Sequence, residues 1–155
     1  MGVGRREDPL AVERALRMSV CAIGGIVDPT PADLRAALDA LVDTGRERTA
    51  ARLHRFSQVR AGSLVWTLSA DGYFLGRVAG PWAYDGSAAA RAVDLVHVRS
   101  CSWLPDPTPE ARVPAATLRT FARGGRNFQQ IHDPYVGEES LTIWREHPQR
   151  PPMAG

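Results

Sequence analysis

The chain has 155 residues, of which 44% are hydrophobic and 23% charged, and its formal net charge is +2. These values are ordinary for a single globular domain with a hydrophobic core. No apolar run reaches the roughly 18 residues of a membrane span, and the first ten residues lack the apolar stretch of a secretory signal. We therefore expect a cytoplasmic protein without a membrane partner.

The first part of the chain predicts a buried strand and then a helix. Residues 18–27 are apolar and rich in small and β-branched residues, which is typical of a strand inside a sheet. Thr30 and Pro31 then mark a helix start, because threonine caps a helix and proline suits its first turn. Leucines at helical spacing continue this helix to Asp43, and Gly45 ends it.

A second helix, from residue 46 or 47 to residue 58, carries a stripe of arginines. Arg48, Arg52 and Arg55 share one side of it. The chain contains no lysine, so every basic side chain is a guanidinium, which suits bidentate contacts to phosphate and stacks on bases. Codon bias of a GC-rich genome explains part of this composition. For the stripe, we prefer a solvated face over a phosphate-binding one.

From Gly62 onward the hydrophobic period changes from that of a helix to two. Residues 62–69 and 73–80 predict the two strands of a hairpin, with its turn at Asp71-Gly72. Residues 93–100 predict a third strand that runs on towards Trp103. Several short strands at this spacing indicate a small barrel or a strongly curved sheet.

The last part of the chain predicts a proline-rich loop and two more helices. Pro114 opens the first helix, which ends at the glycine pair 124–125, and residues 138–146 form an amphipathic terminal helix. We therefore expect one domain over residues 1–155, with the barrel core in residues 62–133 and disordered ends in residues 1–10 and 147–155.

Catalytic and metal-binding motifs are missing from the sequence. We find no phosphate-binding loop, dinucleotide fingerprint, nucleophile elbow or zinc-protease motif. Cys21 and Cys101 predict two buried thiols, and the four histidines are scattered without the spacing of metal ligands. We therefore expect no catalytic residue, no cofactor and no metal.

The aromatic residues gather in the β segment, where they suggest a binding pocket. Trp82 and Tyr84 follow a Gly-Pro break, and rings at the rim of a barrel suit a flat ligand. Trp66 shares its strand face with leucines, so core packing explains it equally well. The candidate pocket consists of Trp66, Tyr73, Trp82, Tyr84 and Trp103. The arginines expected to hold phosphates beside it are Arg77, Arg99, Arg123 and Arg126.

A resemblance to a known family rests on the run GSLVWTLSADGYFLGRVAGPWAYD, followed by VDLVHVRSCSW, VPAATLRTF and NFQQIHD. These segments resemble the EVE-like domains of the PUA-like superfamily, whose relatives include the ASCH, YTH and SRA types. The resemblance covers roughly residues 62–133. It implies an α+β fold, a small PUA-like β-barrel with flanking helices.

The resemblance also implies a function, because such domains accept a modified base in an aromatic-lined pocket. We expect a reader of a modified, most plausibly methylated, base in DNA that flips the base into the pocket while the four arginines hold flanking phosphates. A role in restriction or regulation would need a separate nuclease or effector protein as partner. Three alternatives stay open: an RNA reader of the same fold, a small nucleoside-processing enzyme, and a protein-interaction module.

Overall fold

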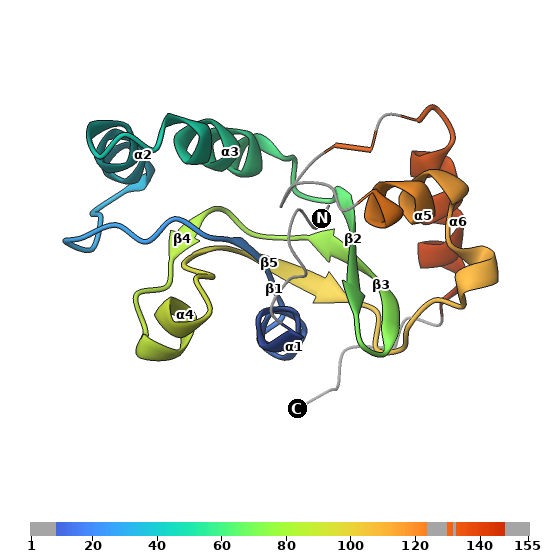
Figure 1. Ribbon diagram of the computed structural model, residues 1–155. Coiled ribbons are helices and arrows are strands. Elements are labelled where there is room, and N and C mark those ends of the chain that lie inside the picture. Colours follow the sequence, from blue (N-terminus) through green and yellow to red (C-terminus); the bar gives the residue numbers. More distant parts are fainter. Residues whose placement is uncertain (1–8, 124–129, 132, 148–155) are drawn as a thin grey trace.

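The structure, a computed structural model of the chain, describes residues 9–123, 130–131 and 133–147. It is an α+β fold in which a curled antiparallel half-barrel sheet is flanked by helices (Figure 1). The coarse fold class expected from the sequence is therefore confirmed. The elements are α1 (Pro9–Arg17), β1 (Val20–Ile23), α2 (Leu34–Asp43), α3 (Glu47–Gln58), β2 (Leu64–Ser69), β3 (Gly72–Val78), β4 (Ala83–Tyr84), α4 (Ala88–Ala92), β5 (His97–Trp103), the 3-10 helix η1 (Glu110–Arg112), α5 (Ala115–Ala122) and α6 (Val136–Glu146).

The sheet is built around β5, and every strand pairing in it is antiparallel. One edge of β5 pairs with β1, while its other edge pairs first with β4 and then with β3. The hairpin expected from the sequence is present, since β2 and β3 pair from Leu64 opposite Arg77 to Ser69 opposite Gly72. The turn glycine Gly72 has φ +126, a conformation that favours glycine.

The two faces of the sheet bury two separate cores. Successive side chains on a strand point to opposite faces, so Leu75 and Val78 belong to different cores. The helices α2 and α3 cover the face of Val78, where Leu53 and Phe56 are almost fully buried. The helices α5 and α6 cover the other face, where Leu75 packs. Figure 1 shows these two helix pairs on separate sides of the sheet.

Several element bounds differ from those expected. The helix α2 begins at Leu34, because Asp33 rather than Thr30 is its cap and accepts a 2.8 Å hydrogen bond from the Ala36 amide. The third strand begins at His97 instead of residue 93, since Asp94 has φ 49, which no strand residue adopts. The helix α1 and the short elements β4 and α4 were not predicted from the sequence.

The structure differs from the expected domain limits at two places. Pro9 and Leu10, which we placed in a disordered end, lie in α1. The strand β1 belongs to the sheet although it lies outside residues 62–133.

Cys21 and Cys101 are both free and buried, as expected. Within the described residues, no cluster of three or more histidine, cysteine or carboxylate side chains is placed to hold a metal ion.

Candidate functional site

A groove of about 1450 Å³ lies between the sheet and the C-terminal half of α6. Its floor includes Leu64, Arg77 and Ser102, which pair with one another across β2, β3 and β5. Paired residues on neighbouring strands point to the same face, so this row faces the side that α5 and α6 cover. The other lining residues are Ala61, Gly62, Val78, Ala79, Trp103, Leu104, Pro105, Asp106, Leu141, Trp144, Arg145 and His147.

The helix α6 forms one wall of this groove, and its position is fixed by its buried side. Ile143 and Ser140 are buried against the sheet, and the indole N–H of Trp66 donates a 3.0 Å hydrogen bond to Ser140 Oγ. Trp144 and Arg145 follow Leu141 by three and four residues, so these three side chains share another side of the helix. Because Ser140 and Ile143 fix α6 on the sheet, the side of the helix that carries Leu141, Trp144 and Arg145 lines the groove.

Two arginines in the groove are free to bind a ligand. Arg77 and Arg145 are exposed, and within the described residues neither guanidinium has a hydrogen bond or an ion pair. The half-buried ring of Trp144 packs partly against the core beneath α6. One carboxylate, that of Asp106, also lines the groove. An indole and two guanidinium groups that line the same groove suit a ligand that joins a flat ring to an anion.

Two of the five candidate pocket aromatics lie in the core beneath α5 and α6. Trp66 is only 4% exposed, and its polar N–H is committed to Ser140. Tyr73 packs edge-to-face on Phe121, with 5.6 Å between the ring centroids. Both rings therefore contribute to the packing of the helices on the sheet.

Trp82 and Tyr84 lie together, but they surround a buried histidine. The Trp82 indole N–H donates to His97 Nδ1 across 3.1 Å, and the Tyr84 ring meets the imidazole edge-to-face. His97 Nε2 lies 2.8 Å from the Gly25 carbonyl oxygen, so Nε2 carries the proton and Nδ1 accepts. Burial lowers the pKa of His97 below its usual value. The cluster thus holds a neutral imidazole with both nitrogens satisfied.

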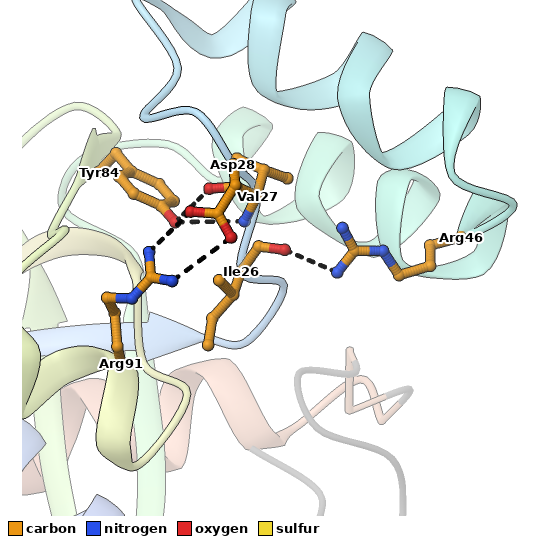
Figure 2. A network of polar contacts seen from close by, with 6 residues as sticks. All are labelled: Ile26, Val27, Asp28, Arg46, Tyr84 and Arg91. Atoms are coloured by element: carbon orange, nitrogen blue, oxygen red, sulfur yellow. Dashed lines mark hydrogen bonds and ion pairs between the residues drawn. The ribbon is translucent and has the colours of Figure 1, made fainter.

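The hydroxyl of Tyr84 belongs to a network that fixes the segment between β1 and α2 (Figure 2). It accepts from the Val27 amide and donates to the Val27 carbonyl, each across 3.2 Å. Arg91 binds both carboxylate oxygens of Asp28, and Arg46 donates to the Ile26 carbonyl across 2.7 Å. Tyr84 therefore has a structural task in this network.

The glycine pair before this segment is explained by one carboxylate. Asp94 Oδ1 accepts a 3.0 Å hydrogen bond from the Gly25 amide. A Cβ on Gly24 would lie 2.5 Å from Asp94 Oδ2, which is too close for any side chain. The two glycines thus allow the backbone to approach Asp94.

Trp103 borders the groove, but its ring lies on the opposite face of the sheet from Arg77. A Cβ on Gly76 would lie 2.5 Å from the Trp103 ring, and Gly76 points away from the face of Arg77. The indole N–H donates to the Val20 carbonyl across 2.9 Å. Trp66 and Tyr73 thus pack in the core beneath α5 and α6, whereas Trp82, Tyr84 and Trp103 pack against the core beneath α2 and α3.

The four candidate arginines are also separated. Arg77 lies in the groove, Arg123 is exposed at the end of α5, and Arg126 lies outside the described residues. Arg99 is only 5% exposed and donates to the carbonyls of Gly80, Phe56 and Val59. Its guanidinium holds the C-terminal end of α3 on the sheet, so it is not placed to bind a phosphate.

Trp144 and Arg145 are the groove residues that the sequence analysis missed. Their helix was predicted over residues 138–146, but neither residue was named as a candidate for binding. A tryptophan followed directly by an arginine on the last predicted helix is the one signal that marked them.

Comparison with models of known protein families, with curated proteins and with solved structures found no significant match. Within the part of the chain that the structure describes, every helix is too short or too polar to cross a bilayer.

Proposed function

We propose that the protein binds nucleic acid in the groove beside α6, with an unpaired base on Trp144 and neighbouring phosphates on Arg77 and Arg145. The observation that carries this proposal is that the half-buried Trp144 lines one groove with Arg77 and Arg145, whose guanidinium groups have no partner within the described residues. Aromatic rings bind bases of any sequence by stacking, while arginines bind the phosphates between them. We therefore propose Trp144 as the base-binding ring, in place of the five aromatic residues of the β segment that were expected from the sequence.

The surroundings of Trp144 favour a methylated base. Leu64 and Leu141 line the groove with it and offer an apolar surface on which a methyl group can be buried. Extruding a base from a duplex costs a few kcal/mol, whereas stacking on one ring returns about 1–3 kcal/mol. A single indole therefore suits a base that is already weakly stacked or unpaired. We propose a methylated base in DNA as the ligand.

The finer family assignment is part of the same proposal. A curled antiparallel sheet that contains the hairpin β2–β3 supports an EVE-like, PUA-like domain. Such a domain reads a base without cleaving the strand, so a role in restriction or regulation requires a separate nuclease or effector protein.

Fluorescence anisotropy with a panel of labelled 12-nucleotide strands tests the proposal. The panel contains methylated cytosine, methylated adenine and unmodified DNA, each single-stranded and duplex, together with a matched RNA. We expect the tightest binding for single-stranded DNA with a methylated base. Tighter binding of the RNA would assign the groove to an RNA reader, and equal affinity for methylated and plain DNA would contradict the role of the methyl group.

A charge-matched pair of variants tests whether the groove is the site. Replacing Arg77 and Arg145 by glutamine should lower the slope of log affinity against log salt by about 1.4, because each phosphate contact on a single strand contributes about 0.7. The control replaces Arg17 and Arg35, which are exposed on α1 and α2, and should keep the slope of the parent. Equal slopes for the two double variants would contradict the proposal.

A further inference from the structure

The helix α3 carries a stripe of positive charge that the groove does not explain. Arg48, Arg52 and Arg55 follow one another at spacings of four and three residues, so they share one side of the helix. Arg48 and Arg55 are exposed, and in the described part of the chain their guanidinium groups have no hydrogen bond or ion pair. The opposite side of α3 is buried.

Two arginines of the stripe have no carboxylate at helical spacing. No acidic residue stands three or four positions from Arg48 or Arg55 to neutralise its charge. On the neighbouring helix α2, by contrast, Arg35 lies 3.6 Å from the carboxylate of Asp39, four residues further on. A bound polyanion would supply negative charge beside Arg48 and Arg55.

The stripe is also held rigidly on the sheet. Leu53 and Phe56 are at most 1% exposed beneath it. The buried Arg99 donates to the carbonyls of Phe56 and Val59 at the C-terminal end of the helix. Because the platform is fixed, little order has to be created when its arginines bind a ligand.

The stripe and the groove are connected by a short segment of chain. The helix ends at Gln58, and after the exposed Arg60 the chain reaches Ala61 and Gly62, which line the groove. The Gly62 amide donates to the Val78 carbonyl across 2.7 Å, which fixes this segment to β3. The C-terminal end of α3 therefore lies three residues before Ala61, the first residue that lines the groove.

We propose that the arginine stripe of α3 is a second nucleic-acid contact, which binds backbone phosphates of nucleotides that flank the base in the groove. Arg48 and Arg55 are separated by about 10 Å along the helix axis, at 1.5 Å per residue. At about 3.4 Å per nucleotide in a stacked strand, this length matches about three nucleotides. The inference rests on the proposed function of the groove and extends its footprint.

Two oligonucleotide lengths separate the stripe from the groove. A 4-nucleotide and a 12-nucleotide single-stranded DNA carry the same central methylated base, and their affinities are measured by tryptophan fluorescence and by anisotropy. The variant replaces Arg48 and Arg55 by glutamine, and the control again replaces Arg17 and Arg35. The stripe variant should bind the 4-nucleotide strand as the parent does, while its salt slope on the 12-nucleotide strand falls by about 1.4.

Each other outcome overturns a defined part of the account. A stripe variant that matches the Arg17/Arg35 control on the 12-nucleotide strand overturns the stripe and leaves the groove intact. A parent protein that binds neither strand overturns both proposals. If the Arg77/Arg145 variant binds as the parent does while the stripe variant does not, the groove is refuted, and α3 binds nucleic acid on its own and not beside a base in the groove.

Discussion

Trp66 donates its indole N–H to Ser140 Oγ across 3.0 Å, and this buried hydrogen bond joins β2 to α6. The two residues are 74 positions apart in the sequence, so the bond fixes the wall of the groove to the sheet that forms its floor. Leu141, Trp144 and Arg145 depend on it for their position.

Removing the acceptor should therefore loosen this wall. We expect Ser140→Ala to lower the free energy of unfolding by about 1–3 kcal/mol, the cost of depriving a buried donor of its partner. Urea denaturation measures the change. Thr142→Ala is the control, because Thr142 is exposed and its hydroxyl donates to the Glu138 carbonyl of its own helix. Equal stabilities for the two variants would show that the Trp66–Ser140 bond contributes nothing.

Trp82 should act on stability rather than on binding. Its N–H satisfies Nδ1 of the fully buried His97, so Trp82→Ala leaves the imidazole without a donor and opens a void beside it. We expect a loss of about 2–4 kcal/mol in urea denaturation, with oligonucleotide affinity unchanged for the folded protein. Trp82→Phe, which keeps the ring but not the N–H, should lose less. An alanine variant of parental stability that binds DNA poorly would restore Trp82 to the binding site.

The burial of His97 predicts an acid-sensitive fold. Its pKa is lowered chiefly by burial, against the opposing effects of the Gly25 carbonyl and of Asp94. The unfolded chain therefore takes up a proton on this residue at a higher pH than the native protein does. The contribution is fully present above about pH 6.5 and is lost as pH falls below that value.

Unfolding free energies at about pH 7.5 and about pH 5.5 measure this effect. The parent should lose more stability between the two than His97→Gln, because glutamine does not titrate. His54→Gln, at an exposed position on α3, should behave as the parent does. The same pH dependence in the parent and in His97→Gln would contradict the assignment.

Arg99 should behave as a structural residue, contrary to the phosphate contact expected from the sequence. Arg99→Ala removes the donor from three carbonyls at once, and we expect a loss of about 3 kcal/mol or more. Arg99→Lys should not restore stability, since one ammonium group cannot reproduce the planar fork. The exposed Arg123→Ala should stay within about 0.5 kcal/mol of the parent. An Arg99→Ala protein with parental stability and a reduced salt slope would favour the phosphate contact.

Local signals in the sequence predicted most of the fold. Alternation on both sides of Asp71-Gly72 predicted the hairpin β2–β3, and helical spacing predicted α2, α3, α5 and α6. The observed bounds of helices and strands differ from the predicted ones where a single hydrogen bond, local or long-range, fixes the end of the element. For example, Asp94 accepts a hydrogen bond from the amide of Gly25, which lies 69 positions earlier in the chain. No local pattern in the sequence shows that the strand after Asp94 must begin at His97.

The site was less predictable, because its residues come from distant parts of the chain. Arg77 was a candidate and does line the groove, since its alternation on β3 is a local property. Arg99 alternates in the same way, yet it is buried because the end of α3 lies over it. Leu141 and Trp144 have a spacing that fits a core and a groove equally well. Only the packing of α6 on the sheet distinguishes the two.

Affinity for a methylated 12-nucleotide single strand, compared between the parent, Trp144→Phe and Trp144→Ala, tests the central claim most directly. The account predicts that phenylalanine keeps most of the affinity, because the ring still stacks. Alanine should weaken binding by about 5- to 150-fold, which corresponds to the loss of about 1–3 kcal/mol of stacking. Circular dichroism at each titration temperature confirms that all three proteins are folded. A folded Trp144→Ala protein that binds the strand as tightly as the parent would contradict the account.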